Sequence, residues 1–491
     1  METNLFIGGK YVAAAGDARF ADIEPATERE LAQVADAGAE DVERAVAAAR
    51  EAAHHGPWPK MSAEARGRII GRIADGIEKR ARELGRLEAR DVGKPVSECV
   101  NHDVARAARN LRFFANAVEA WTQEASYGDA KFLGTDLKLV SLTERAPLGV
   151  GAIIIPWNSP LMLGTWNLGP CLAAGNACIY KPSELAPLTA IALGEIANEA
   201  GLPPGVLNVL PGQGTAGAAL VSHPGVDGIA FTGGVATGKR VMAAAAESLK
   251  RVTLELGGKS PNVVFADADL KRAAAGVARS IFRSQGQSCV AGSRLLVERN
   301  IADEFIAMVL GDMRRLKIGD PLNDDTEYGP LISAAHRDRV DSFVKEAVAG
   351  GAELLAGGAI PEHPRPGYYY LPTVLNRLRP DAPAVREEIF GPVLSVERFE
   401  DEEEAAAMAN ATRYGLAAYI WTRDLERALR VAAHLRTGMV WVNSFFLRDL
   451  RTPFGGSGQS GVGRQGGRFS LEFWTEPKLV CLTYPEHEVS R

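Results

Sequence analysis

The sequence predicts an α/β protein with two doubly wound parallel-sheet domains. Apolar, β-branched runs alternate with helical stretches between residues 148 and 249, and a second alternating block covers residues 260 to 422. The chain has 491 residues, which is too long for a single hydrophobic core. We therefore expect two α/β domains that meet near residue 257.

The strands and helices follow from hydrophobic periodicity. In the first block we expect buried strands at 148–156, 177–182, 206–211 and 226–234, and helices at 160–174, 187–200, 214–222 and 236–249. In the second block we expect strands at 260–266, 293–299, 392–399 and 417–422, and helices at 269–284, 302–315 and 334–350. Before both blocks, residues 1–22 predict a strand pair, and 38–55, 62–90 and 97–120 predict helices.

Composition excludes several classes of protein. Apolar residues make up 46% of the chain, charged residues 24%, and the net charge is −6 without a basic stripe, so a nucleic-acid partner is not expected. No apolar run approaches the roughly 20 residues that span a membrane, and METNLFIGGKYV lacks the regions of a signal peptide. Five cysteines without a CxxC pair favour free thiols in the cytoplasm and no metal site.

Glycine-rich turns are candidate phosphate sites. GQGTAG (212–217) follows a predicted strand, but no suitable acidic residue lies about 20 positions on. GVGRQG (461–466) lacks both the strand and the helix of that motif, so we expect a loop there. FTGG (231–234) competes with GQGTAG, because it leads into a predicted helix whose first N–H groups suit a pyrophosphate. The pattern alone leaves open whether either turn binds phosphate.

Two charged positions have both a functional and a structural interpretation. Lys181 and Glu184 come directly after a predicted strand, where they are placed to bracket a ribose; alternatively, Ser183 only caps a helix. Glu255 lies between two leucines, and an apolar setting raises the pKa of a carboxyl toward that of a general base. The alternative is a glutamate whose head reaches solvent.

Cys289 lies in the polar turn SQGQSCVAGSR, unlike Cys171 and Cys178 in alanine-rich apolar runs. Gly286 and Gly292 allow a ligand to approach the backbone, and a nucleophilic thiol needs such access. The alternative is an incidental thiol in a polar turn.

Seven segments together resemble the aldehyde dehydrogenase superfamily in order and spacing. They are PWN (156–158), KPSE (181–184), FTGG (231–234), LELGGKSP (254–261), FRSQGQSCVAGSR (282–294), EEIFGPV (387–393) and PFGG (453–456). The resemblance implies that Cys289 attacks the aldehyde, that Asn158 and the Cys289 N–H stabilise the oxyanion, and that Glu255 activates water. Relatives that pass the acyl group to coenzyme A generally lack this glutamate, so hydrolysis to the free acid is implied.

The resemblance also implies a nicotinamide cofactor. Lys181 and Glu184 would contact its ribose, and the GQGTAG turn would have no part in phosphate binding. A carboxylate repels a 2′-phosphate, so Glu184 favours NAD over NADP. The other implied cofactor contacts are Ile155, Trp157 and Gly234 near the pyrophosphate, and Glu388 and Phe390 on the nicotinamide side.

Two positions depart from the family pattern. Asn167 stands where many members have a lysine linked to a glutamate that matches Glu476, which puts that auxiliary proton route in doubt. Gly234 stands where many members have serine, so one phosphate contact would come from the backbone alone.

The substrate class follows from the string RDLRTPFGG (448–456), which is similar to that of muconic semialdehyde dehydrogenases of aromatic catabolism. Arg448 and Arg106 are expected to bind a substrate carboxylate beside Phe454, because arginine binds carboxylates through two parallel hydrogen bonds. Substrates would be carboxylated unsaturated semialdehydes such as 2-hydroxymuconate semialdehyde, its carboxymethyl homologue or 2-aminomuconate semialdehyde. Arg109 roughly shares the helix face of Arg106, and Arg112 does so less. The alternative is that these helix arginines are surface charges, and Arg451 is expected to serve structure near the subunit interface.

Three other functions remain to be weighed. A broad-specificity or betaine-aldehyde oxidiser would place a cationic substrate beside two arginines. A cysteine thioesterase or esterase would need no nicotinamide. A structural member of the family would lack the nucleophile, whereas Cys289 and Glu255 are both present.

The resemblance implies three parts. Residues 1–123 and 147–256 would form a Rossmann-like NAD-binding domain, and 257–457 the catalytic domain. Residues 124–146 and 458–491 would form a small β oligomerisation arm and the C-terminal tail. The alternating patterns at 137–147 and 478–485 predict exposed strands, which pair readily with another chain. A homodimer or homotetramer is therefore expected.

Overall fold

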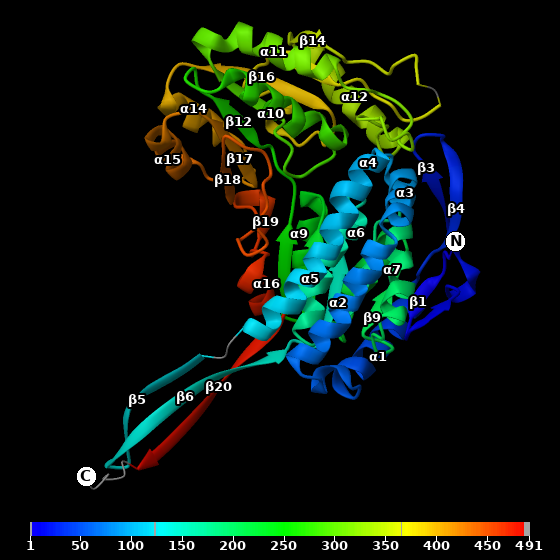
Figure 1. Ribbon diagram of the computed structural model, residues 1–491, viewed down its shortest axis with the longest axis vertical. Coiled ribbons are helices and arrows are strands. Elements are labelled where there is room, and N and C mark those ends of the chain that lie inside the picture. Colours follow the sequence, from blue (N-terminus) through cyan, green and yellow to red (C-terminus); the bar gives the residue numbers. More distant parts are fainter. Residues whose placement is uncertain (1, 122–123, 365, 486–491) are drawn as a thin grey trace.

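The computed structural model describes residues 2–121, 124–364 and 366–485. Residues 122–123 at an expected domain boundary and 486–491 at the end of the expected tail lie outside the described residues. The chain forms two α/β bodies and a long β arm that projects away from the first body (Figure 1). The expected fold class is confirmed.

The first body is built on an eight-stranded sheet of order β19-β11-β10-β7-β8-β9-β1-β2. Its central strands are parallel and almost wholly buried, which explains why they are continuous apolar runs. They are β7 (Val150–Ile154), β8 (Ala177–Lys181), β9 (Leu207–Val209), β10 (Gly228–Thr232) and β11 (Arg251–Glu255). The antiparallel strands at its edges are β1 (Leu5–Ile7), β2 (Lys10–Val12) and β19 (Gly461–Val462).

Helices accompany this sheet: α1 (Ala39–His54), α2 (Ala63–Lys79), α3 (Ala81–Val92), α5 (Ala105–Ala120), α6 (Pro160–Ala173), α7 (Leu188–Glu199), α8 (Gly214–Ser222) and α9 (Val235–Ala246). The single helix expected over 62–90 is wrong, because the chain breaks at Arg80 between α2 and α3. The helix expected over 97–120 starts irregularly, with α4 (Val96–Glu98) and a π-helical turn at Cys99–Val104 before α5. Cys99 is fully buried in that turn.

The second body is built on a seven-stranded sheet of order β14-β15-β16-β13-β12-β17-β18, in which only β14 is antiparallel. The strands are β12 (Pro261–Val264), β13 (Arg294–Glu298), β14 (Glu353–Ala356), β15 (Thr373–Asn376), β16 (Val393–Phe399), β17 (Ala417–Trp421) and β18 (Met439–Val442). Its helices are α10 (Leu270–Phe282), α11 (Ala302–Arg314), α12 (Ala334–Ala349), α13 (Pro383–Arg386), α14 (Glu402–Ala409) and α15 (Leu425–His434).

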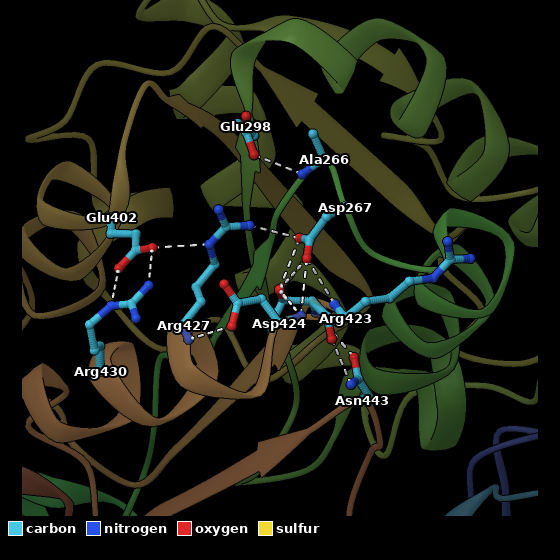
Figure 2. A network of polar contacts seen from close by, with 10 residues as sticks. Ala266, Asp267, Glu298, Glu402, Arg423, Asp424, Arg427, Arg430 and Asn443 are labelled. Carbon is cyan, nitrogen blue, oxygen red and sulfur yellow. Dashed lines mark hydrogen bonds and ion pairs between the residues drawn. The ribbon is translucent and has the colours of Figure 1, made fainter.

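A polar network centred on Asp267 joins two strand ends of this second sheet (Figure 2). The Asp267 carboxylate, just after β12, accepts hydrogen bonds from the Thr422 hydroxyl at 2.8 Å and from the backbone N–H groups of Arg423 and Asp424 at 3.1 Å. Arg427 of α15 adds an ion pair at 2.8 Å. The network therefore anchors the start of α15 to the end of β12.

The arm is a three-stranded antiparallel sheet of order β20-β6-β5, with β5 (Glu124–Phe132), β6 (Thr135–Pro147) and β20 (Thr475–Pro485). It carries exposed Tyr127, Phe132 and Leu479. A separate hairpin, β3 (Arg19–Glu24) with β4 (Arg29–Ala35), was not expected from the sequence.

The loop expected at 461–466 is wrong in part. Gly461 and Val462 form β19, which pairs with β11, and α16 (Gly467–Phe473) follows directly. A two-residue strand has too little periodicity to be recognised; only its partner β11 makes it a strand. Within the described part of the chain, no helix is both long and apolar enough to cross a membrane.

Candidate active site

A cavity of about 280 Å³ lies where the two bodies meet, and it holds most of the expected site residues. β7, β10 and β11 end at its border, as expected for ligand sites beyond the carboxyl ends of parallel strands. The lining includes Trp157, Asn158, Gly234, Glu255, Cys289, His336, Glu388 and Phe390. Residues more than 200 positions apart are thus brought together.

Cys289 follows α10 and a tight turn that delivers its thiol to the cavity. Ser284 and Gln285 have left-handed backbones (φ 50° and 55°). At Gly286 φ is 69°, and a Cβ there would stand 2.3 Å from the Gly391 carbonyl oxygen, so only glycine fits. Burial, with the nearby charges of Glu388 and Glu255, raises the pKa of the Cys289 thiol to about 12. In this state of the protein the thiol is therefore neutral at physiological pH.

Glu255 ends β11 and is 4% exposed. Neither of its carboxylate oxygens has a hydrogen-bond partner among the described residues. Burial raises its pKa well above the ordinary value, although the charges of Arg464 and Arg448 offset part of this effect. An unpartnered carboxyl of raised pKa beside a thiol is chemically suited to accept a proton.

Asn158 lies between β7 and α6 and is 8% exposed. Its Nδ2 donates one hydrogen bond to the Gln287 carbonyl oxygen at 3.0 Å, two residues before Cys289. An amide nitrogen carries two protons, so one remains for a ligand. Asn158 and Cys289 also line a second cavity of about 70 Å³ together with Phe454, and they therefore lie between the two cavities.

The adenosine-side residues line a larger cavity of about 530 Å³. It contains Ile155, Lys181 and Glu184, and it shares Trp157 and the 232–233 turn with the Cys289 cavity. The lining also includes Gly214 and Gly217 from the GQGTAG segment, and Arg240 of α9, a cation that sequence reasoning missed.

These two joined cavities fit a dinucleotide. Gly234 is the N-cap of α9 and makes no side-chain cap bond, so the first N–H groups of the helix are available to an anion. A Cβ on Gly234 would meet open space. Where many relatives have a serine, this chain has empty space beside Gly234, and only backbone N–H groups are left to donate to a phosphate there.

Glu388 and Phe390 are held by the first turns of α12. Arg339 donates to the carbonyl oxygens of Glu388 (2.9 Å) and Ile389 (2.6 Å), and His336 Nε2 donates to that of Phe390 at 2.8 Å. Phe390 has a left-handed backbone (φ 59°), and its ring packs edge-on against Trp157 at 5.4 Å. His336 and Arg339 were not predicted, since nothing in their helix marks them as contacts of a distant loop.

The Glu388 carboxylate faces the glycine pair that follows β11. Its Oε1 accepts a hydrogen bond from Gly258 N at 3.1 Å, and burial raises its pKa to about 7. A Cβ on Gly257 would stand 2.0 Å from Glu388 Oε2. The small residues of LELGGKSP therefore make room for this carboxylate.

Arg106 and Arg448 lie outside the linings of the three cavities. The Arg448 guanidinium stacks over Trp166 (4.7 Å) and Phe454 (5.1 Å), and its buried Nη2 has no partner among the described residues. Burial lowers the pKa of each arginine to about 10, and the charge of Arg448 further lowers that of Arg106. The two cations thus lie near each other, and Phe454 separates Arg448 from the cavity at Cys289.

The other arginines behave differently. Arg112 pairs with Asp75 and Glu78 on the surface, and Arg451, whose side chain is 80% exposed, pairs with Asp449 at 2.7 Å. They are occupied by local carboxylates.

The departure at Asn167 has a structural counterpart. Asn167 Oδ1 accepts a hydrogen bond from Gln465 Nε2 at 2.9 Å, whereas Glu476 pairs with Arg251 at 2.6 Å. The two positions that match the family's proton route are thus engaged with other partners, consistent with the doubt that Asn167 raised about this route.

Sequence reasoning also missed the polar floor of the smaller cavity, which is made by Lys94, Glu98, His102, Asp103 and Ser159. His102 Nδ1 lies 2.8 Å from Asp103 Oδ1. Charged residues in a helical stretch normally face solvent, so no local signal marked them as buried.

Comparison with known proteins defines the class. The model of the aldehyde dehydrogenase family matches residues 11–480, and the chain belongs to this family. It is 46% identical over 491 residues to 2-hydroxymuconic semialdehyde dehydrogenase of Pseudomonas sp. (strain CF600), which covers 98% of this chain and 99% of the relative. It is 44% identical over 486 residues to the NADP/NAD-dependent aldehyde dehydrogenase PuuC of Escherichia coli (strain K12), covering 98% of this chain and 96% of that one.

Among solved structures, the indole-3-acetaldehyde dehydrogenase AldA of P. syringae, in complex with NAD+ and IAA, superposes with a TM-score of 0.94 at 43% identity. The alignment covers 98% of this chain and 97% of that chain. The chain is thus similar over its whole length to aldehyde dehydrogenases that act on different aldehydes.

Proposed function

We propose that the protein oxidises an aldehyde to a carboxylic acid with NAD, through a covalent intermediate on Cys289. The observation that carries this proposal is that Cys289, Asn158 and Glu255 line one cavity, which continues into a dinucleotide-sized cavity beside Lys181 and Glu184. A relative of 43% identity is known in complex with NAD+. Glu184 disfavours a 2′-phosphate, which supports NAD over NADP.

Each residue has a chemical task in this reaction. The Cys289 thiol releases its proton to solvent, and the sulfur attacks the aldehyde carbon. The free Asn158 amide proton and the Cys289 N–H stabilise the oxyanion; removing one such donor typically costs about 3 kcal/mol. NAD, when bound, accepts the hydride that leaves this carbon. Glu255 then takes a proton from water, the resulting hydroxide attacks the thioester carbonyl, and the C–S bond breaks to release the acid. Glu255 returns its proton to the Cys289 sulfur, which restores the thiol.

We propose a carboxylated unsaturated semialdehyde, such as 2-hydroxymuconate semialdehyde or its carboxymethyl homologue, as the substrate. Arg106 and Arg448 support it, because these neighbouring, partly desolvated cations make no ion pair with a carboxylate of the described residues, although the charges of Asp449 and Glu255 reach Arg448. The Arg448 Nη2 is available to a substrate. A relative of 46% identity is a 2-hydroxymuconic semialdehyde dehydrogenase.

The test measures NADH formation by absorbance, with 2-hydroxymuconate semialdehyde set against a chain-matched aldehyde that lacks the carboxylate. We expect the carboxylated substrate to be favoured about a hundredfold in kcat/KM, equivalent to about 2.7 kcal/mol. Arg448→Met should lose this margin, whereas the matched control Arg451→Met, at an exposed side chain paired with Asp449, should keep it. Equal reaction of both aldehydes would reject the carboxylate site and leave a general aldehyde oxidiser.

We further propose the domain organisation expected from the sequence. Residues 1–123 and 147–256 form the NAD-binding domain, 257–457 form the catalytic domain that carries Cys289, and 124–146 with β20 of the tail from 458 form an oligomerisation arm. The exposed apolar residues of β5 and β20 support a homodimer or homotetramer. The unpaired thiols of the described chain support a cytoplasmic location. Light scattering across a concentration series tests the assembly.

A further inference from the structure

Lys94 is a buried charge directly beneath the candidate oxyanion site. It follows α3 and is 2% exposed. Its ammonium makes an ion pair with Asp103, which is 1% exposed, and donates to the Ser159 hydroxyl at 3.0 Å and to the Asn158 carbonyl oxygen at 3.3 Å. An ammonium has three protons, so these three bonds use all of them.

Such a charge is stable only with its partners. Burial disfavours the charged form of Lys94, but the carboxylates around it, Asp103 first, outweigh burial and hold its pKa above the ordinary value. Removing one partner of a buried ion pair is strongly destabilising, because it leaves an uncompensated buried charge, whereas replacing both partners costs much less. The ion pair therefore holds the Lys94 ammonium in one position, and the Asn158 backbone that accepts from it is held as well.

What the pair contacts is the backbone of Asn158. The Asn158 carbonyl oxygen accepts from Lys94 and from the Ser159 hydroxyl, the latter at 2.6 Å. The side chain of Asn158 is fixed separately by its bond to the Gln287 carbonyl oxygen. With both ends held, the direction of the remaining amide proton is set. Oxyanion donors depend on such preorganisation.

We propose that Lys94, with Asp103 as its counter-ion, is a positioning residue for the proposed reaction, because it holds Asn158 in the orientation in which its amide donates to the oxyanion. This inference rests on the proposed role of Asn158. It assigns Lys94 no contact with substrate or cofactor.

A double-mutant cycle tests the proposal. Lys94→Met/Asp103→Asn removes both charges of the pair, and Glu98, the other carboxylate near Lys94, keeps its ion pair with Arg283 at 3.0 Å. With Asn158 present, this variant should lower kcat about 10- to 100-fold with little change in KM, as expected when a reacting group is misplaced. In an Asn158→Ala background the same change should lower kcat less than about threefold, because sites that act through one another are not additive.

Lys79→Met, at an exposed lysine of α2, is the matched control and should leave kcat unchanged in both backgrounds. Ser159→Ala provides a second route that keeps the ion pair intact, should Lys94→Met/Asp103→Asn fail to fold. It should lower kcat about 3- to 10-fold, again only when Asn158 is present.

Equal losses in both backgrounds, for whichever variant folds, would mean a general structural role and overturn the proposal. If Asn158→Ala keeps the wild-type kcat, Asn158 does not stabilise the oxyanion. The positioning role proposed for Lys94 is then refuted as well. If Asn158→Ala lowers kcat and Lys94→Met/Asp103→Asn lowers it by the same further factor, only the positioning role of Lys94 is refuted. The oxyanion role of Asn158 then stands.

Discussion

The resting thiol of Cys289 should be poorly reactive in the absence of cofactor. Its pKa of about 12 lies three units above the ordinary value of about 9. At pH 8 this lowers the thiolate fraction about a thousandfold. A thiolate of higher pKa is intrinsically more nucleophilic, with a Brønsted coefficient of about 0.45, which restores a factor of about 20. The net expectation is alkylation about 50-fold slower than for a free thiol.

The assay is alkylation by iodoacetamide from pH 6 to 10, with the Cys289 peptide quantified by mass spectrometry and N-acetylcysteine as the reference thiol. The rate should still rise at pH 10, because only the deprotonated form reacts and a raised pKa places its titration above that pH. Glu388→Gln should speed alkylation, since the charge of Glu388 contributes more than that of Glu255 to holding the thiol neutral. Glu255→Gln should give a smaller increase.

A Cys289 that reacts at pH 8 as fast as N-acetylcysteine, with a plateau below pH 9, would refute this reasoning. The turn at 284–288 would then stabilise the thiolate more strongly than burial and the two carboxyls destabilise it. If alkylation is slow and Glu388→Gln does not change its rate, burial alone sets the pKa of the Cys289 thiol.

Three further outcomes are expected. Glu255→Gln should form about one NADH per active site in a stopped-flow burst and then turn over slowly, because the thioester lacks its base; unchanged steady turnover would exclude this role. Asn158→Ala should lower kcat about 10²–10³-fold while leaving Cys289 alkylation unaltered, and a change in KM alone would contradict an oxyanion role. Asp267→Ala should lower the free energy of unfolding by about 1–3 kcal/mol in urea denaturation, whereas Asp303→Ala, at an exposed ion pair, should change it by less than about 1 kcal/mol.

Much of the fold could be predicted because its signals are local. β7, β8, β10, β12 and β13 all lie within the expected strands, since a buried parallel strand is a continuous apolar run of few residues. β19 and the β3–β4 hairpin could not be predicted. Their residues become strands only because distant or irregular partners pair with them, as Gly461 pairs with Glu255.

The candidate site divides in the same way. The motifs around Asn158, Glu255 and Cys289 are contiguous strings, so they could be recognised together with the other segments by their order and spacing, and the structure brings them to one cavity. The residues that hold them could not be recognised. Lys94 and His336 act on segments 64 and 54 positions away in the chain, at Asn158 and Phe390.

The sequence by itself determined the α/β class and the order of the strands and helices along the chain, and it predicted the chemical groups of the proposed reaction, because periodicity and short motifs depend on neighbouring residues. Only the tertiary structure decided which charges are buried, which arginines lie side by side, and what fixes each reacting group. Burial and electrostatic coupling depend on distances in space. These are set when the ends of β7, β10 and β11 meet the Cys289 turn of the second body.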